Sequence, residues 1–282
     1  MSTLLEPFGY EFFRHAIWVA VLAGALCGLV GTYVVLRGMS YIGHGLSHAI
    51  FGGAAASFAL SINFYVGAFT WGFVSALLIQ AVARRRTIGA DAAIGVITSA
   101  SFAVGIAIIS TTGGFTRNFE AALFGDVLGV TMGDVLVVAG VTLATGIVVF
   151  VRYRQLLFAT FDPEVAEVSG IRLASIDAMM AIILASTITA TMNVVGVMLI
   201  AAVLVIPPVI GRLLTDSFHR MLWISVVTGA VCGFVGVYLS YWLNWSSGAT
   251  VVITASALFV VAYVVSTVRR RVGMPDVGLD VH

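Results

Sequence analysis

Two histidines, His44 and His48, lie four residues apart in the apolar run Gly43-His-Gly-Leu-Ser-His-Ala49. A spacing of i, i+4 places both imidazoles on one face of an α-helix. Ionisable side chains are costly at membrane depth, so a pair of this kind marks a functional site by default. Two neutral imidazoles one turn apart can chelate a divalent transition metal ion. The sequence therefore predicts a metal site inside a membrane span.

Two other interpretations of the histidine pair stay open. A buried histidine commonly has only a packing role, with its ring satisfied by a neighbouring hydroxyl or carbonyl group, and paired histidines can also relay protons. The helix is rich in small residues, which allow neighbouring backbones to approach closely, so we expect the histidine face to meet a pathway or a partner helix. The small residues are Gly43, Gly45, Ser47, Ala49, Gly52, Gly53, Ala54, Ala55 and Ala56.

The composition indicates an all-α protein that crosses a membrane several times. The 282 residues are 60% hydrophobic and 10% charged, with a mean hydropathy of +1.09, whereas soluble domains carry about 25% charged residues. We expect residues 1–282 to form a single transmembrane domain. All fourteen basic residues are arginine. A Walker A loop needs a lysine, so ATP-driven transport would require a separate ATPase chain.

Each crossing of a bilayer needs about 20 apolar residues, and the chain has eight or nine candidate spans. The sixth and seventh are short and meet at Asn193-Val-Val-Gly196, so they form either two helices or one broken segment. If Arg37 marks the membrane boundary, the histidines lie roughly 9 to 15 Å along the second span, near mid-depth, where transporters commonly place substrate sites. The candidate spans cover residues 15–36, 40–60, 63–83, 92–110, 134–151, 177–195, 196–211, 221–243 and 248–268.

The arginines give the predicted helices an orientation. In the nine-span arrangement only Arg14 and Arg117 fall on one side, and the other twelve fall on the opposite side. The positive-inside rule then places the C-terminus in the cytoplasm, and the N-terminus outside. The twelve are Arg37, Arg84, Arg85, Arg86, Arg152, Arg154, Arg172, Arg212, Arg220, Arg269, Arg270 and Arg271.

Two connections between the predicted spans are long. Residues 111–133 lie outside the cell and suit either a re-entrant helix or a plain loop. Residues 152–176 lie in the cytoplasm, where Asp162 can cap a short helix that has Pro163 at its first position and Gly170 after its end. That helix is either a solvated connector or a docking element for a cytoplasmic subunit.

Other polar or helix-breaking residues are weaker candidates for the metal. Asp91, Asp134 and Asp177 each lie at a predicted helix start and are interpreted as helix caps. The adjacent prolines Pro207 and Pro208 kink or break the seventh span. An enzyme is not expected, because the residues between the two histidines do not form a His-Glu-x-x-His zinc motif.

These motifs, taken in order, resemble the membrane permease of metal-type ABC importers, which take up zinc, manganese or iron(II). The family's second-helix pattern, Gly-Asp-Ala-Leu-Ser-His-Ala, is similar to residues 43–49. The other similar segments are Asp91-Ala-Ala-Ile-Gly95, Leu123-Phe-Gly-Asp-Val-Leu128, Phe161-Asp-Pro-Glu-Val-Ala166 with Gly170, Asn193-Val-Val-Gly-Val-Met-Leu-Ile200 and Val205-Ile-Pro-Pro208.

The resemblance implies a homodimeric permease in the plasma membrane of a prokaryote, surrounded by lipid. It implies a cytoplasmic ABC ATPase and an extracytoplasmic metal-binding protein as partners, and metal contacts from His44 and His48. The metal is the substrate, and neither a bound cofactor nor a nucleic-acid partner is expected. The residues that the resemblance assigns to ATPase coupling are Phe161, Asp162, Pro163, Glu164 and Gly170.

The chain departs from the family pattern at two positions. His44 replaces an aspartate, and Gly52 stands where proline is usual. Loss of the carboxylate removes a hard oxygen ligand, and two imidazoles suit zinc, copper or nickel better than manganese. Zinc is therefore favoured as the substrate over manganese and iron(II). Two nitrogens are incomplete for a tetrahedral ion, so a second copy of the chain, water or the external loop would complete the site.

A competing hypothesis needs no ATPase. The chain could be a stand-alone secondary metal transporter or proton channel that uses the histidine pair as a relay. Uptake by the purified chain alone, driven by a proton gradient, would favour that alternative over an ABC importer.

Overall fold

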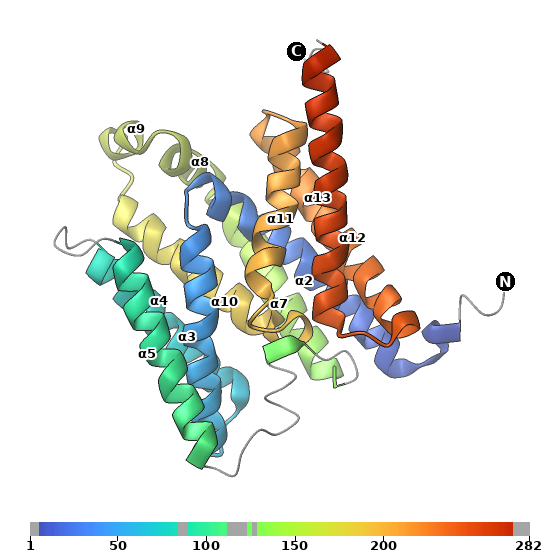
Figure 1. Ribbon diagram of the computed structural model, residues 1–282. Helices are drawn as coiled ribbons and strands as arrows, with labels where there is room; N and C mark the ends of the chain where they lie inside the picture. The colour runs from blue at the N-terminus through green and yellow to red at the C-terminus, as the bar shows by residue number, and fades with distance from the viewer. Residues whose placement is uncertain (1–5, 84–89, 112–122, 126–128, 273–282) are drawn as a thin grey trace.

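The computed structural model describes residues 6–83, 90–111, 123–125 and 129–272, and these form a bundle of long α-helices (Figure 1). Within them, nine helices match the nine candidate spans and confirm the all-α fold. The nine are α2 (Glu11–Leu36), α3 (Ser40–Ala59), α4 (Phe64–Ala83), α5 (Ala90–Thr111), α7 (Met132–Val151), α10 (Leu173–Val195), α11 (Ile200–Leu214), α12 (Phe218–Leu243) and α13 (Ser247–Val272). Six of these have the length and hydropathy of a membrane span, while α4 and α11 supply shorter apolar segments.

Helix α10 lies between two groups of helices. On one side, α3 packs against α4 and α5, and on the other, α2, α11, α12 and α13 pack together (Figure 1). The connection between α7 and α10 lies at the same end of the bundle as the end of α13, and the start of α2 lies toward the opposite end (Figure 1). The cytoplasmic orientation that the arginine positions indicate for this end stays a prediction.

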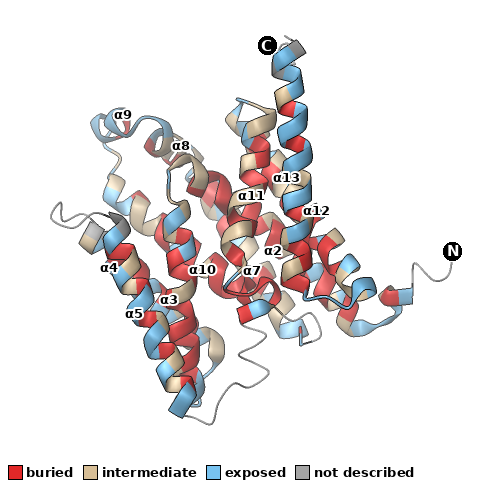
Figure 2. Ribbon diagram, in the orientation of Figure 1, coloured by how far each residue is buried: buried red, intermediate tan, exposed pale blue. Residues whose placement is uncertain are grey.

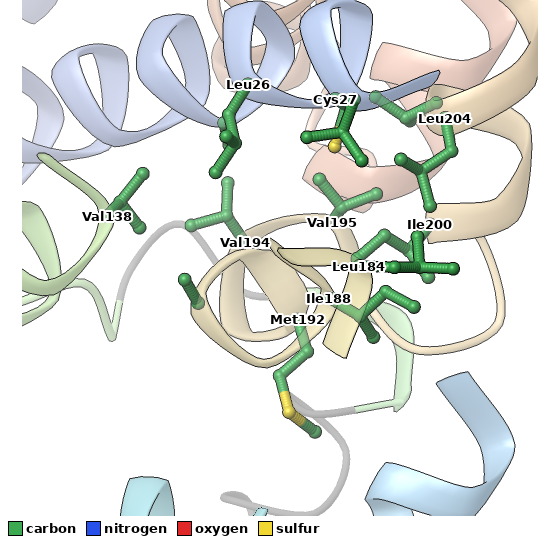
Figure 3. Packing of buried hydrophobic residues seen from close by; sticks show 14 of the residues in the cluster. Leu26, Cys27, Val138, Leu184, Ile188, Met192, Val194, Val195, Ile200 and Leu204 are labelled. Carbon is green, nitrogen blue, oxygen red and sulfur yellow. The ribbon is translucent and has the colours of Figure 1, made fainter. Parts of the chain in front are cut away.

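The core is formed where α10 meets α2. Buried residues concentrate on α2, α3 and α10, while α7, α12 and α13 turn exposed apolar faces outward (Figure 2). Leu26 and Cys27 of α2 point toward Val194 and Val195 of α10 (Figure 3). In a bilayer those outward apolar faces suit contact with hydrocarbon, since each helix satisfies its own backbone hydrogen bonds.

Small residues allow α2 and α12 to pack at very short range. A Cβ atom added to Gly24 would lie 2.0 Å from the carbonyl oxygen of Gly229, and one added to Gly28 would lie 2.2 Å from that of Ser225. Helices in membranes associate through such close backbone packing, because apolar side chains gain little by leaving lipid. The α2–α12 contact therefore depends on the absence of side chains at these positions.

The junction of α10 and α11 is a sharp turn at Gly196, so the sixth and seventh candidate spans are separate helices. Gly196 has a φ of 85°, and a Cβ atom there would lie 2.5 Å from the carbonyl oxygen of Leu123. Only glycine tolerates both a positive φ and so close a neighbouring backbone atom. Residues 123–125 thus lie against this turn, but most of the 111–133 connection, where a re-entrant helix or a loop was predicted, lies outside the described residues.

The 152–176 connection contains two helices, α8 (Tyr153–Phe161) and α9 (Pro163–Val168). The predicted cap is present, since the side chain of Asp162 accepts a hydrogen bond of 3.0 Å from the Val165 N–H. Gly170, at a φ of 79°, follows the end of α9 in a Schellman turn. Sequence analysis predicted α9 but missed α8, whose buried Leu156 and Ala159 share one face at a spacing of three.

Candidate metal site and coupling segment

The histidine pair lies on α3 with the two rings adjacent. The ring centroids of His44 and His48 are 4.9 Å apart, and the ring planes meet at 84°. His44 is exposed and His48 is partly buried. The hydroxyl group of Ser47, which lies between them in sequence, donates a 2.7 Å hydrogen bond to the backbone carbonyl oxygen of His44. The i, i+4 spacing in the sequence therefore correctly predicted that the two imidazole rings are adjacent.

Helix α5 covers one side of the pair. The ring of Phe102 lies edge-on to the ring of His48, with centroids 5.2 Å apart. Gly45 sits so close to α5 that an added Cβ atom would lie 2.5 Å from a methyl carbon of Ile94. His44 has no such cover from the described part of the chain, in which its side chain is exposed.

In the described part of the chain, the two histidines do not belong to a larger cluster of metal-binding side chains. Within the described residues, no group of three or more His, Cys, Asp and Glu side chains could hold a metal ion. Gly52, the second departure from the family pattern, has a packing role, because an added Cβ atom would lie 2.3 Å from the Ser101 carbonyl oxygen. The glycine lets α3 approach α5 directly, and proline would collide with that backbone.

Asp134 and Asp177 turn out to have different roles. Asp134 is in the first turn of α7, where it forms a capping box with Thr131, as the cap interpretation predicts. Asp177 is not a cap, because α10 begins four residues earlier, at Leu173. Its Oδ1 instead lies 2.5 Å from Nη2 of Arg37, at the end of α2. Asp91 lies in the first turn of α5, and its side chain is outside the described residues.

Sequence analysis also missed a polar cluster that joins the ends of three spans. The hydroxyl group of Tyr65 on α4 donates a hydrogen bond to Oδ1 of Asp134 on α7. Nδ2 of Asn193 on α10 lies 3.0 Å from the Tyr65 hydroxyl and 3.3 Å from Asp134 Oδ1. These residues are up to 128 positions apart, so no local pattern could have connected them.

The predicted coupling residues form an exposed unit at one end of the bundle. Phe161 closes α8, and its ring lies 5.6 Å from that of Phe218 on α12. Glu164 and Val165 on α9 are exposed, and Val168 is 91% exposed. A two-turn helix that presents both acidic and apolar side chains to solvent has the character of a contact surface.

Comparison with known proteins identifies the family. The model of the ABC 3 transport family matches residues 9–266 of the chain. The chain is a member of this family. It is 36% identical to "Manganese transport system membrane protein MntB" of Synechocystis sp. over 279 residues, which cover 98% of this chain and 87% of that protein. It is 32% identical to "Probable iron transport system membrane protein" of Haemophilus influenzae over 268 residues, 95% of this chain and 98% of that protein.

A solved structure agrees with this assignment. The structure of PsaBC from Streptococcus pneumoniae in complex with Fab superposes on this ABC 3 family chain with a TM-score of 0.88 and 28% identity, covering 97% of this chain and 99% of the other. The chain is therefore a permease of a metal ABC importer, as the sequence motifs predicted.

Proposed function

We propose that His44 and His48 bind a divalent metal ion during its passage through this permease. The observation that carries the proposal is the 4.9 Å separation of two imidazole rings on an exposed face of α3. An exposed imidazole facing hydrocarbon would be costly, so this face suits a hydrated pathway. Weak binding by few ligands is appropriate for a transit site, because the ion must also leave.

A second copy of the chain completes the site in this proposal. Zinc prefers four ligands in a tetrahedral arrangement, and one chain offers two nitrogens from α3. Two copies that face each other across the open side of α3 would bring four imidazoles to one pathway. The single transmembrane domain of residues 1–282 would then be one half of a homodimer.

The identity of the metal rests on two opposed observations. The paired imidazoles favour zinc over manganese, since manganese prefers oxygen ligands. The names of the related proteins from Synechocystis sp. and Haemophilus influenzae favour manganese and iron, respectively. We propose zinc as the substrate, with manganese as the second candidate, and competition between the two ions in an uptake assay distinguishes them.

Membership of the family and the exposed surface of α9 support two proposed partners, an ATPase and a metal-binding protein. We place this cytoplasmic segment, from Phe161 to Gly170, against an ABC ATPase, with an extracytoplasmic metal-binding protein at the opposite end of the bundle. The exposed Val168 and Glu164 supply the contact surface. This arrangement puts the C-terminus in the cytoplasm of a prokaryotic cell and the chain in its plasma membrane.

The decisive experiment measures uptake by the complete importer in proteoliposomes. The double variant His44→Ala with His48→Ala should lose uptake of zinc and manganese while the ATPase still assembles on the permease. His219→Ala is the matched control, because His219 is an exposed histidine at the start of α12 and far along the chain from the pair. Normal uptake by the double variant would exclude the proposed site, and proton-driven uptake by the permease alone would favour the secondary-transport hypothesis.

A further inference from the structure

The ion pair between Arg37 and Asp177 joins two helices at the end of the bundle that holds α8 and α9. The side chain of Arg37 is only 12% exposed, and Asp177 is 35% exposed. A largely buried ion pair is weak evidence for stability, because desolvation of both charges offsets their attraction. The better-attested use of such a pair is to fix one geometry between elements.

In sequence, the two charged residues lie close to the two functional segments. Asp177 follows the coupling segment, Phe161 to Gly170, and Arg37 precedes α3, which carries His44 and His48. Gly170 ends the turn after α9, and Asp177 follows seven residues later, in the second turn of α10. On the other side, Arg37 is followed by Gly38, whose φ of 66° forms the turn into α3. His44 lies seven residues after Arg37. A displacement of the coupling segment can therefore reach the base of α3 through this ion pair, alongside the direct packing of α10 against α2 and α3.

Two aromatic contacts of Phe218 link α8 to the last turn of α2. The ring of Phe218 lies 5.6 Å from that of Phe161 on α8 and 5.5 Å from that of Tyr33 on α2. The carbonyl oxygen of Tyr33 accepts a 2.9 Å hydrogen bond from the Arg37 N–H. The coupling segment is thus linked to the last turn of α2 by two indirect routes, one through Phe218 of α12 and one through Asp177 of α10.

The guanidinium group of Arg37 also has a hydrogen-bond donor without a partner in the described part of the chain. Its Nη1 atom is buried and has no hydrogen-bond partner among the described residues. A buried donor that is left unpaired raises the energy of the state that contains it. A second arrangement, in which the guanidinium group is paired more fully, would relieve this penalty.

We propose that Arg37 and Asp177 form a coupling pair that positions α3 according to the state of α8 and α9. Movement of the coupling segment on its ATPase shifts α10, the ion pair transfers the shift to the end of α2, and Gly38 acts as the pivot for α3. The histidine pathway then opens or closes in step with ATP hydrolysis. This inference rests on the proposed function, since it assigns the pair to the same transport cycle.

The test is the amount of ATP hydrolysed per metal ion taken up by the complete importer in proteoliposomes. The key variant is Arg37→Gln with Asp177→Asn, because it removes both charges and leaves no lone buried charge to destabilise the fold. We expect uptake to fall about tenfold, within the range typical of coupling energies, while ATP hydrolysis and zinc binding to the purified permease stay near wild type. Arg212→Gln, which breaks an exposed ion pair within the α11 region, is the matched control.

A second double variant exchanges the two charges and tests whether the restored ion pair restores coupling. Arg37→Asp with Asp177→Arg should recover a large part of the uptake per ATP, since the contact is restored with its partners swapped. Unchanged coupling in the double neutral variant would overturn the proposal. A parallel loss of assembly, hydrolysis and uptake would also overturn it, because that pattern indicates a purely structural role. Loss of zinc binding in the histidine variants is measured separately, so failure of the metal site is distinguishable from failure of the coupling pair.

Discussion

His44 and His48 are one helical turn apart, yet among the described residues only His48 has an aromatic ring of another helix against it. Phe102 of α5 holds the His48 ring at a centroid distance of 5.2 Å, whereas the His44 ring is exposed on the open side of α3. One imidazole is thus fixed by packing and the other is free to meet an ion that arrives along the pathway. In the proposed site, His48 would be a positioned ligand and His44 an accessible one.

Metal binding by this pair should weaken in acid. Coordination requires neutral imidazole, so protons compete with the metal for both rings. We expect zinc affinity to be greatest at neutral to mildly alkaline pH and to fall steeply as the pH drops from about 7.5 to about 5.5, where imidazoles take up protons. Equilibrium binding of zinc to the purified permease across this range measures the effect. A flat profile would contradict coordination by the two histidines.

His44→Asp should shift the selectivity of the importer toward manganese. The change restores the aspartate of the family pattern and replaces a nitrogen ligand with a hard oxygen ligand, which suits manganese better than a second imidazole does. The ratio of manganese to zinc uptake should rise by about tenfold or more, equivalent to at least ~1.4 kcal/mol of relative affinity. Competition between the two ions in proteoliposomes gives the ratio. His44→Asn serves as the control, since it supplies an oxygen without the charge.

Part of this architecture was predictable from local sequence. Hydropathy predicted eight or nine spans, because a helix that crosses a bilayer must be apolar over about 20 residues. Asp162, Pro163 and Gly170 predicted α9 and its cap because capping depends on residues close together in sequence. The i, i+4 histidines predicted adjacent rings for the same reason.

The remaining features depend on contacts between distant segments. Arg37 and Asp177 are 140 residues apart, and each was interpreted locally, as a boundary marker and as a cap. Asp177 was misassigned because the apolar run begins there, while α10 itself begins at Leu173. Only the packing of α10 against α2 brings the two charges together.

Asp134→Ala should destabilise the bundle without acting at the metal site. The carboxylate accepts hydrogen bonds from Tyr65 and Asn193, and its loss leaves both donors without that partner. Each partly buried donor left unpaired costs about 1 to 3 kcal/mol, so the unfolding temperature in detergent should fall by several degrees. Tyr65→Phe should have a smaller effect, because Asn193 can still reach Asp134. Wild-type thermal stability in Asp134→Ala would show that the cluster contributes nothing to the fold.

The close contact of α2 with α12 makes Gly24 intolerant of even one methyl group. In Gly24→Ala the new Cβ atom would lie 2.0 Å from the carbonyl oxygen of Gly229, so the helices must separate and lose their packing along the whole interface. We expect little folded protein, measured as monodisperse material after extraction in mild detergent. Gly140→Ala is the matched control, since nothing lies within 4 Å of a Cβ atom there. That variant should be neutral or slightly stabilising, because alanine favours helix by about 1 kcal/mol over glycine. Equal yields of the two variants would mean that α2 and α12 do not depend on backbone proximity.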